Sequence, residues 1–307
     1  MSGTAVDPGA ASVVIPTLDA AAHLPALFAA LDAQTPSPPR EVLLVDSGST
    51  DGTREIAAAH PHGRVLEIAD FSHGRSRNRG ARAARGEIVV LLTQDALPRD
   101  ETWLANLLAP LTDPSLAATF SRQVPRPTAS PMERFFLETR FPAGPPVRRA
   151  RRENEVLTLE KVFFSNVSAA IRLALLLAHP FDETLVMSED QQWARDVLAA
   201  GHATLYVPDS VVIHSHDYDL RQVFGRYFDS VHSLTQIFPA HGLRTSAAMG
   251  LGYLRRECRH MLRHPRWLPY YVLYTLAKAG GTLGGHFAGA MPRSMARRLS
   301  LYPRHWR

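Results

Sequence analysis

The stretch "EIVVLLTQDALP", residues 87–98, joins a strongly apolar half to a polar end. Its five consecutive apolar residues predict a strand that is buried on both faces of a sheet. The polar residues Thr93, Gln94 and Asp95 follow at the end of that strand. A buried strand that brings one carboxylate to its carboxyl end is typical of a sheet that binds a ligand at that edge.

Similar strands alternate with helices through the first hundred residues. This alternation predicts an α/β fold, with a mainly parallel, Rossmann-like central sheet and helices on both faces. The predicted strands are 12–17, 41–48, 64–69 and 87–95. Between them we predict a helix at 21–33, a turn followed by a helix within 49–60, and a helix at 74–86.

Polar residues end three of these strands, as Pro16–Thr17, Asp46–Ser47 and Asp95. Because ligands of such sheets bind beyond the carboxyl ends of the strands, we expect the three ends to line one crevice. An acid in the position of Asp46 can accept a hydrogen bond from a base N–H or a ribose hydroxyl. The alternative is an Asx-type turn, with Asp51 near the start of a helix.

Beyond residue 115 the loops become longer, and after 220 the strand patterns end. Helical segments rich in arginine and aromatic residues then run to the C-terminus. The chain is therefore expected to divide into the regions 1–115, 116–220 and 221–307. Within the middle region we predict strands at 162–172 and 203–216, a helix at 188–201 and a charged surface loop at 145–156.

The composition is that of an ordinary globular protein, with 307 residues of which 45% are hydrophobic and 21% charged. The 34 basic and 29 acidic residues give a net charge of +5, and no basic motif interleaved with aromatic residues predicts binding to nucleic acid. A single cysteine, Cys258, excludes an intrachain disulfide and suits a reducing compartment. The first twelve residues lack the pattern of a secretory signal, so we expect a cytoplasmic protein.

The C-terminal region has a composition that suits a bilayer surface. No apolar run approaches the roughly 18 residues of a transmembrane helix. The segment "WLPYYVLYTLAKAGG", 267–281, is too short to span a bilayer but is able to lie on one. With its basic neighbours it predicts either a peripheral contact with the inner face of the plasma membrane, or helices that pack on the protein or form an oligomer.

The third predicted helix carries Arg75, Arg79 and Arg82 on one face, while Arg77 and Asn78 lie on other faces of its first turns. A helix N-terminus with arginines nearby suits a diphosphate, which backbone N–H groups and guanidinium groups bind together. The alternative interpretation is a solvated basic face.

Two acids, Glu189 and Asp190, occupy the first positions of a later helix. Ser188 and Gln191 match an S-x-x-Q capping box, and acids in a first turn suit the helix dipole. The same dipole keeps a carboxylate ionised, as a general base must be. The two interpretations are compatible, and the residues alone do not separate them.

The lone acid at the end of the fourth strand, Asp95, suits a hard divalent cation. Mg²⁺ and Mn²⁺ prefer oxygen ligands and commonly use one or two carboxylates together with substrate phosphates. His216, in "HSHDY", offers a second protein ligand. The alternatives are a loop cap for Asp95 and a packed, hydrogen-bonded imidazole for His216.

Five motifs occur in an order that resembles the inverting family 2 glycosyltransferases of the GT-A fold. They are "SVVIPTLD", "VDSGSTDGT", the Arg-Asn pair of "GRSRNRG", the strand that ends in Asp95, and "FDE" followed by "SED". The phrases "FSHGRSRN", "LLTQDALP", "FFSNVSAAIR", "PFDE" and "HSHDY" are similar to the rhamnosyltransferase branch of that family. The resemblance covers roughly residues 12 to 220.

The resemblance implies a role for each matching residue. Residues 1–115 would form the nucleotide-sugar half of the GT-A domain and 116–220 its acceptor half. Gln94 replaces the first acid of the family's Asp-x-Asp metal motif, and only Asp95 remains. The implied sites are Pro16, Thr17 and Asp19 in the nucleotide pocket, Asp46 and Ser47 at the base and ribose, Arg77 and Asn78 near the diphosphate, Gln94 beside the donor, Asp95 and His216 at a divalent cation, and Glu189 and Asp190 at the catalytic centre, with Asp190 as the base.

The resemblance also implies a reaction. A sugar, best matched by L-rhamnose from dTDP-L-rhamnose, would pass to a hydroxyl of a glycan or lipid-linked glycan in one inverting, metal-assisted displacement. This is chemistry of polysaccharide biosynthesis at the cell envelope. The alternatives are an inactive module that binds sugar nucleotides, and a sugar-phosphate nucleotidyltransferase, which would carry a Gly-rich basic loop after its first strand.

Overall fold

A computed structural model describes residues 7–240 and 242–306. The first six residues, which carry half of the segment in which we see no secretory signal, lie outside this range. The chain forms two compact units. The sheet unit comprises Met1–Val124, Phe141–Thr184 and Glu189–His214, and the helical unit comprises Pro125–Arg140, Leu185–Ser188 and Ser215–Arg307. The region boundaries expected at 115 and 220 stay predictions.

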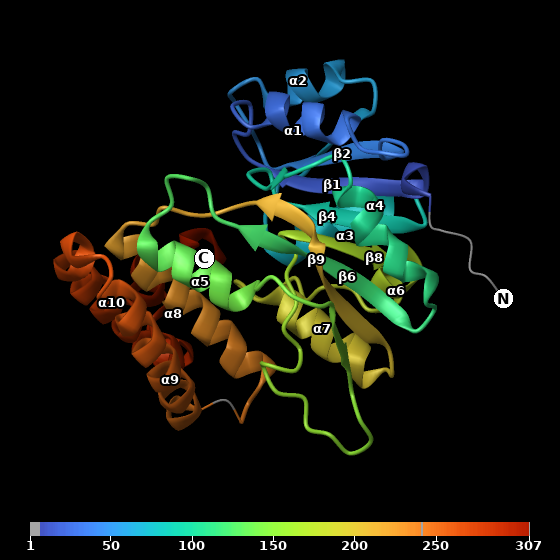
Figure 1. Cartoon of the computed structure of the whole chain (residues 1–307). Helices are drawn as coiled ribbons and strands as arrows, with labels where there is room; N and C mark the ends of the chain where they lie inside the picture. Colours follow the sequence, from blue (N-terminus) through green and yellow to red (C-terminus); the bar gives the residue numbers. More distant parts are fainter. Residues whose placement is uncertain (1–6, 241, 307) are drawn as a thin grey trace. The chain divides into compact units, whose positions relative to one another are not determined.

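The sheet unit is built on one sheet, which has nine strands in the described part of the chain (Figure 1). The strands are β1 (Ala11–Thr17), β2 (Glu41–Asp46), β3 (Gly63–Glu67), β4 (Ile88–Leu92), β5 (Leu97–Pro98), β6 (Leu116–Val124), β7 (Val147–Ala150), β8 (Ser168–Arg172) and β9 (Ala203–Ile213). Their order is β3-β2-β1-β4-β8-β6-β9-β5, and β7 pairs with β9. The ladders β3-β2-β1-β4 and β6-β9 are parallel, whereas β8, β5 and β7 run against their neighbours.

Helices cover both faces of this sheet, which confirms the predicted α/β class. They are α1 (Leu24–Asp32), α2 (Thr53–Ala59), α3 (His73–Ala83), α4 (Trp103–Leu108), α6 (Leu173–Ala178) and α7 (Glu189–Ala199). Because side chains alternate along a strand, Val13 and Ile15 of β1 share one core with α1 and α4, while Val14 faces α3. The middle residues of the buried strands are therefore apolar at consecutive positions.

Two sequence predictions in this unit differ from the structure. The charged run at 145–156 was predicted as a loop, but it contains β7, which pairs with β9. The strand predicted at 162–172 begins only at Ser168. Its first half leaves the ladder because Phe164 packs against Trp193, with ring centroids 5.3 Å apart, and its carbonyl accepts a hydrogen bond from Gln191.

The helical unit contains α5 (Pro131–Arg140), α8 (Leu220–Ile237), α9 (Leu243–Met261), α10 (Leu268–Phe287) and α11 (Arg293–Leu299). Helices α8 and α10 approach closely, since a Cβ added at Gly281 would lie 2.3 Å from the carbonyl oxygen of Phe224. The buried Asp229 accepts hydrogen bonds from Ser300 and from the backbone of Leu301, which fixes the chain after α11. Among the described residues, no helix has the length and apolar character needed to cross a bilayer.

Helix α3 lies close to the sheet because Gly80 has no side chain. A Cβ at this position would lie 2.2 Å from Cγ1 of Val14 and 3.0 Å from Cγ2 of Val45. We expect Gly80→Ala to lower the free energy of unfolding by about 1 to 3 kcal/mol through overpacking. Urea unfolding followed by circular dichroism measures the change.

A glycine on another helix supplies the matched control. Gly252 of α9 has no atom within 4 Å of an added Cβ. Gly252→Ala should raise the free energy of unfolding by up to about 1 kcal/mol, because alanine favours the helix. Equal effects of the two substitutions would contradict the close contact at Gly80.

Candidate active site

The carboxyl end of β2 is organised around the side chain of Asp46. This carboxylate is fully buried. It accepts hydrogen bonds from the backbone N–H groups of Gly48 and Ser49, at 3.1 and 3.0 Å, and from the hydroxyls of Thr17 and Ser49. The turn after β2 therefore has the Asx-type geometry considered from the sequence. The expected contact of Asp46 with a base or ribose stays a prediction.

The loops after β1 and β2 are joined by reciprocal hydrogen bonds. The N–H of Asp19 donates to Oγ of Ser49, and Oδ1 of Asp19 accepts from the N–H of Thr50, both at 2.9 Å. Asp19 has a φ of 48°, a left-handed conformation that short polar residues tolerate. The N–H of Ser47 donates to the carbonyl of Thr17 at 3.0 Å. Two strand ends thus form one connected edge.

Gln94 ties the end of β4 to this edge. Its Oε1 accepts from the N–H of Leu18 at 2.9 Å, and its Nε2 donates to the carbonyl of Leu18 at 3.1 Å. A carboxylate can accept but cannot donate, so an acid at this position would satisfy only half of the pair. The side chain thereby holds the backbone just beyond Pro16 and Thr17.

Asp95 lies beside His214 in the sheet unit. Oδ1 of Asp95 is 3.6 Å from Nε2 of His214. The amide of Gln123 donates to Oγ of Ser165 at 3.0 Å, and its oxygen lies 3.0 Å from Nδ1 of His214. This arrangement favours the tautomer with the proton on Nδ1. Nε2 then presents a lone pair toward the carboxylate, and two electron-pair donors that face one another suit a cation between them.

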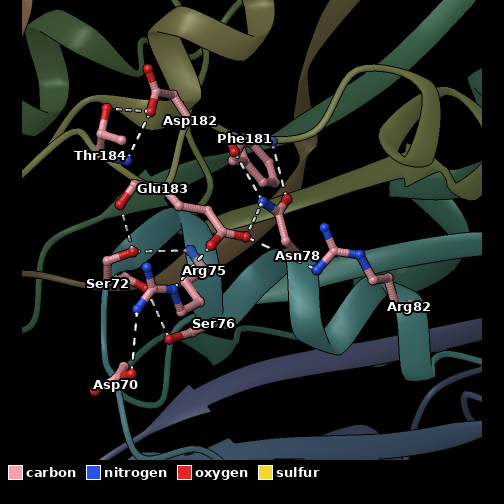
Figure 2. A network of polar contacts seen from close by, with 10 residues as sticks. All are labelled: Asp70, Ser72, Arg75, Ser76, Asn78, Arg82, Phe181, Asp182, Glu183 and Thr184. Carbon is pink, nitrogen blue, oxygen red and sulfur yellow. Dashed lines mark hydrogen bonds and ion pairs between the residues drawn. The ribbon is translucent and has the colours of Figure 1, made fainter.

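Helix α3 is fastened at its start to the segment 181–184 (Figure 2). The amide of Asn78 both donates to the carbonyl and accepts from the N–H of Phe181, at 2.9 and 3.0 Å. Glu183 receives Nδ2 of Asn78 at 3.1 Å and Nε of Arg75 at 3.0 Å. Part of the basic face predicted for this helix is therefore paired within the protein, and the "RN" and "PFDE" motifs are contact partners.

A buried ion pair joins α3 to α7. NH1 of Arg77 lies 3.0 Å from Oε1 of Glu189, and both side chains are more than nine-tenths buried. The amide of Asn166 also donates to Oε1 of Glu189, at 3.4 Å. Burial alone would raise the pKa of Glu189, but the charge of Arg77, with help from His73, holds this pKa below its ordinary value. Glu189 is therefore ionised at neutral pH.

Asp190, the next residue, is shifted in the opposite direction. Burial, followed by the negative charge of Glu189, raises the pKa of Asp190 to about 7. Its Oδ2 accepts from the N–H of Asn166 at 3.4 Å, and its Oδ1 accepts from the N–H of Gln191 at 2.8 Å. Two adjacent carboxyl groups whose pKa values are driven apart are a common arrangement for acid–base chemistry.

Asp190 also lies near the end of β4. The N–H of Thr93 donates to the carbonyl of Val167 at 3.0 Å, and Val167 is the neighbour of Asn166, which binds Asp190. Within the described chain, three buried atoms around this junction have no hydrogen-bond partner: Oγ1 of Thr93, Oδ1 of Asn166 and Oε1 of Gln191. Hydroxyl groups of a ligand would satisfy them.

The predicted capping box at the start of α7 is wrong. The backbone N–H of Gln191 donates to Asp190, and its side-chain amide donates to the carbonyl of Phe164. The N–H that a capping box would direct to Ser188 is therefore donated to Asp190, and Ser188 has a φ of 63° rather than the extended backbone of a capping residue. The start of α7 is thus held by contacts with the segment that precedes β8.

The remaining predicted residues lie in two places. Pro16, Thr17, Asp19, Asp46, Ser47 and Gln94 follow or end the strands β1, β2 and β4, as expected. His216 falls in the helical unit, where its N–H donates to Glu133 and its ring stacks on Tyr218. Sequence reasoning missed Asn166 and His214, although His214 directly follows β9 and Asn166 lies within the quoted phrase "FFSNVSAAIR".

Comparisons with known proteins identify the family of the chain. The family model "Glycosyl transferase family 2" matches residues 12–176, more than half of the chain. The chain belongs to the family 2 glycosyltransferases and is an enzyme of that class. It is 30% identical over 302 residues to the O-antigen chain rhamnosyltransferase RfbN of Salmonella typhimurium, covering 96% of this chain and 95% of the relative. It is 31% identical, with the same coverage, to the rhamnosyltransferase WbaN of Salmonella anatum.

Solved structures agree with the fold. The mannosyltransferase PcManGT from Pyrobaculum calidifontis, solved with GDP-Man and Mn²⁺, superposes with a TM-score of 0.55 at 20% identity, covering 97% of this chain and 82% of that one. S. aureus TarS 1-349 superposes with a TM-score of 0.54 at 17% identity, covering 96% and 87%. The GT-A fold and the resemblance to rhamnosyltransferases are thereby confirmed.

The raised pKa of Asp190 predicts a pH dependence. The sequence predicts Asp190 as the general base, which acts in its ionised form. With Asp190 in that role, kcat/KM for sugar transfer should fall about tenfold for each unit of pH below 7. Glu189→Gln removes a negative charge and leaves the charge of Arg77 in place. Without the negative charge of Glu189, and with the positive charge of Arg77 no longer paired, the pKa of Asp190 falls. The activity of this variant should therefore decline at a lower pH than the activity of the wild type.

The measurement is a pH–rate profile of the wild type and of Glu189→Gln. The exposed Glu153→Gln serves as the control and should leave the profile unchanged. If the acidic limb stays at the same pH in Glu189→Gln, the charge of Glu189 does not set the pKa of the base.

Proposed function

We propose that this enzyme is an inverting rhamnosyltransferase that transfers L-rhamnose from dTDP-β-L-rhamnose to a hydroxyl of a glycan or lipid-linked glycan. The observation that carries the proposal is a carboxyl group with a pKa near 7, Asp190, beside buried polar atoms at the carboxyl edge of the sheet. The similarity to O-antigen chain rhamnosyltransferases over almost the whole chain supports the choice of sugar.

The reaction is one displacement. The acceptor oxygen forms a bond to the anomeric carbon from the face opposite the diphosphate, the bond from that carbon to the phosphate oxygen breaks, and the configuration inverts. Asp190 takes the proton of the attacking hydroxyl. Glu189 stays ionised against Arg77 and keeps the pKa of Asp190 high enough for the base to hold that proton.

A divalent cation, Mg²⁺ or Mn²⁺, fits the residues at the end of β4. We assign Asp95 and His214 as ligands from their facing atoms, and His216 from its chain position two residues later. An imidazole ligand favours Mn²⁺ over the harder Mg²⁺. When bound, the cation neutralises charge on the departing diphosphate. Asp95, His214 and His216 would hold the metal, and Gln94 positions the adjoining loop.

The donor is proposed to bind along the connected edge of β1 and β2. Pro16, Thr17, Asp19 and Ser47 lie there, and the rigidity of the joined loops preorganises the pocket. Asp46 holds this edge through its hydrogen bonds with the turn after β2. To contact the nucleotide, its carboxylate has to exchange one of these protein partners for a group of the nucleotide. Arg77 and Asn78 act near the diphosphate indirectly, because their contacts fix the position of α3.

A peripheral contact with the cytoplasmic face of the membrane is part of the proposal. Several apolar residues of α10 are exposed: Val272, Leu273, Leu276, Leu283 and Phe287. Their spacing places most of them along one side of the helix. Such a stripe, in a basic region, suits the surface of an anionic bilayer that carries a lipid-linked acceptor, and contact with a second subunit is the alternative.

Replacement of Asp190 tests the reaction. Asp190→Asn should reduce sugar transfer by at least about 100-fold, while leaving the affinity for dTDP nearly unchanged. The measurement is release of dTDP from dTDP-rhamnose, with and without acceptor, alongside calorimetric titration with dTDP. Asp209→Asn, an exposed acid on β9, is the matched control. Near-normal transfer by Asp190→Asn would exclude this residue as the base.

Chelation tests the cation. We expect EDTA to abolish transfer, and Mn²⁺ or Mg²⁺ to restore it, with Asp95→Asn requiring at least about tenfold more metal. A donor panel read by thermal shift fixes the nucleotide and the sugar. Donor binding without hydrolysis or transfer under any metal condition would favour an inactive binding module, and formation of sugar nucleotides would favour a nucleotidyltransferase.

A further inference from the structure

The helical unit contains a cavity of about 430 Å³, which we call the aromatic pocket. Its lining comes from the segment before α5, the start of α5, the residues before α8, and the start of α10. The volume lies within the range of about 300 to 1,000 Å³ that is usual for ligand sites. His216, one of the proposed metal ligands, also lines this cavity, whereas no other residue that the proposed reaction uses does so.

The walls of the aromatic pocket combine rings and carboxyl groups. Four aromatic side chains line it: Tyr218, Trp267, Tyr270 and Tyr274. Three acids, Glu133, Asp217 and Asp219, lie among them. Aromatic rings with polar tips present both an apolar face and a hydrogen-bonding edge. The described residues that line the pocket include no lysine or arginine.

Contacts behind the walls hold these groups in place. NH1 of Arg226 donates to the hydroxyl of Tyr218 at 2.9 Å, and its guanidinium lies 5.3 Å from the centroid of that ring. The ring of His216 also stacks on the ring of Tyr218, with the two centroids 4.7 Å apart. Oε1 of Glu133 accepts from the N–H of His216 at 3.1 Å. The pocket is therefore preorganised rather than formed by mobile side chains.

The same lining disfavours two other classes of ligand. Acids without a lysine or arginine on the wall repel a phosphate or diphosphate. A purely lipid chain would cover the carboxyl groups of Glu133, Asp217 and Asp219 and offer them no hydrogen-bond donor. A neutral sugar has C–H faces that pack on aromatic rings and hydroxyl edges that donate to carboxylates.

We propose that the aromatic pocket binds a neutral sugar unit of the acceptor glycan. Trp267, Tyr270 and Tyr274 stack on the sugar faces, and Glu133 and Asp217 bind the hydroxyls. This assignment rests on the proposed glycosyltransfer and adds to it the chemistry of the acceptor, an uncharged saccharide. The chain itself connects the pocket to the sheet unit, since His216 and Asp217 come shortly after the end of β9 at Ile213.

The test uses the full-length protein and a panel of methyl glycosides of neutral hexoses and deoxyhexoses. Binding is titrated by saturation-transfer NMR for the wild type, Trp267→Ala, Tyr270→Ala and Glu133→Gln. We expect at least one glycoside to bind the wild type and each variant to lose affinity by about tenfold or more. Phe287→Ala removes an exposed ring outside the pocket and is the matched control.

Hydrolysis of dTDP-rhamnose without acceptor separates this proposal from the one it rests on. The pocket variants should hydrolyse the donor at the wild-type rate, which also shows that they are folded. If the wild type binds no glycoside of the panel, or if the variants bind as well as the wild type, the assignment of the pocket is wrong. If the wild type hydrolyses no donor, the proposed function fails instead, whatever the result with the glycosides.

Discussion

Burial of the Arg77–Glu189 ion pair is the constraint on which the active site depends. Two charges removed from water are costly unless they are matched, and breaking such a pair by removing one partner typically costs about 3 to 5 kcal/mol. The pair joins α3 to α7, segments that are 112 residues apart in the chain. It also fixes a negative charge next to Asp190. One interaction therefore contributes to the tertiary structure and to the proton affinity of the adjacent carboxyl group.

The surrounding hydrogen bonds show how separate motifs form one framework. Asn78 binds the backbone of Phe181, and Glu183 receives two side chains of α3, so the start of that helix is fixed to the chain that leads toward α7 (Figure 2). On the other side, Gln94 and Ser49 connect the loops after β1, β2 and β4. The residues of the motifs thus serve mainly to hold the site's geometry, with few groups left for chemistry.

The sequence predicted this site unevenly, for physical reasons. Apolar runs and their polar ends located β1, β2, β4 and α7 to within a few residues, because periodicity reports burial along the chain. Periodicity does not report which distant group a polar side chain meets. Arg77 and Asn78 were therefore predicted near a ligand, whereas their partners in the structure are Glu189 and Phe181. Likewise, a local pattern predicted a cap at Ser188 where a tertiary contact takes its place.

The amide at position 94 has a consequence for how charge is distributed at the site. The amide of Gln94 accepts from the N–H of Leu18 and donates to its carbonyl, and an ionised acid at this position could not do both. The strand end therefore carries one negative charge instead of two. A single carboxylate attracts a free divalent ion less strongly than a pair does. The remaining positions around such an ion would then be filled by oxygen atoms other than a second carboxylate from this strand end.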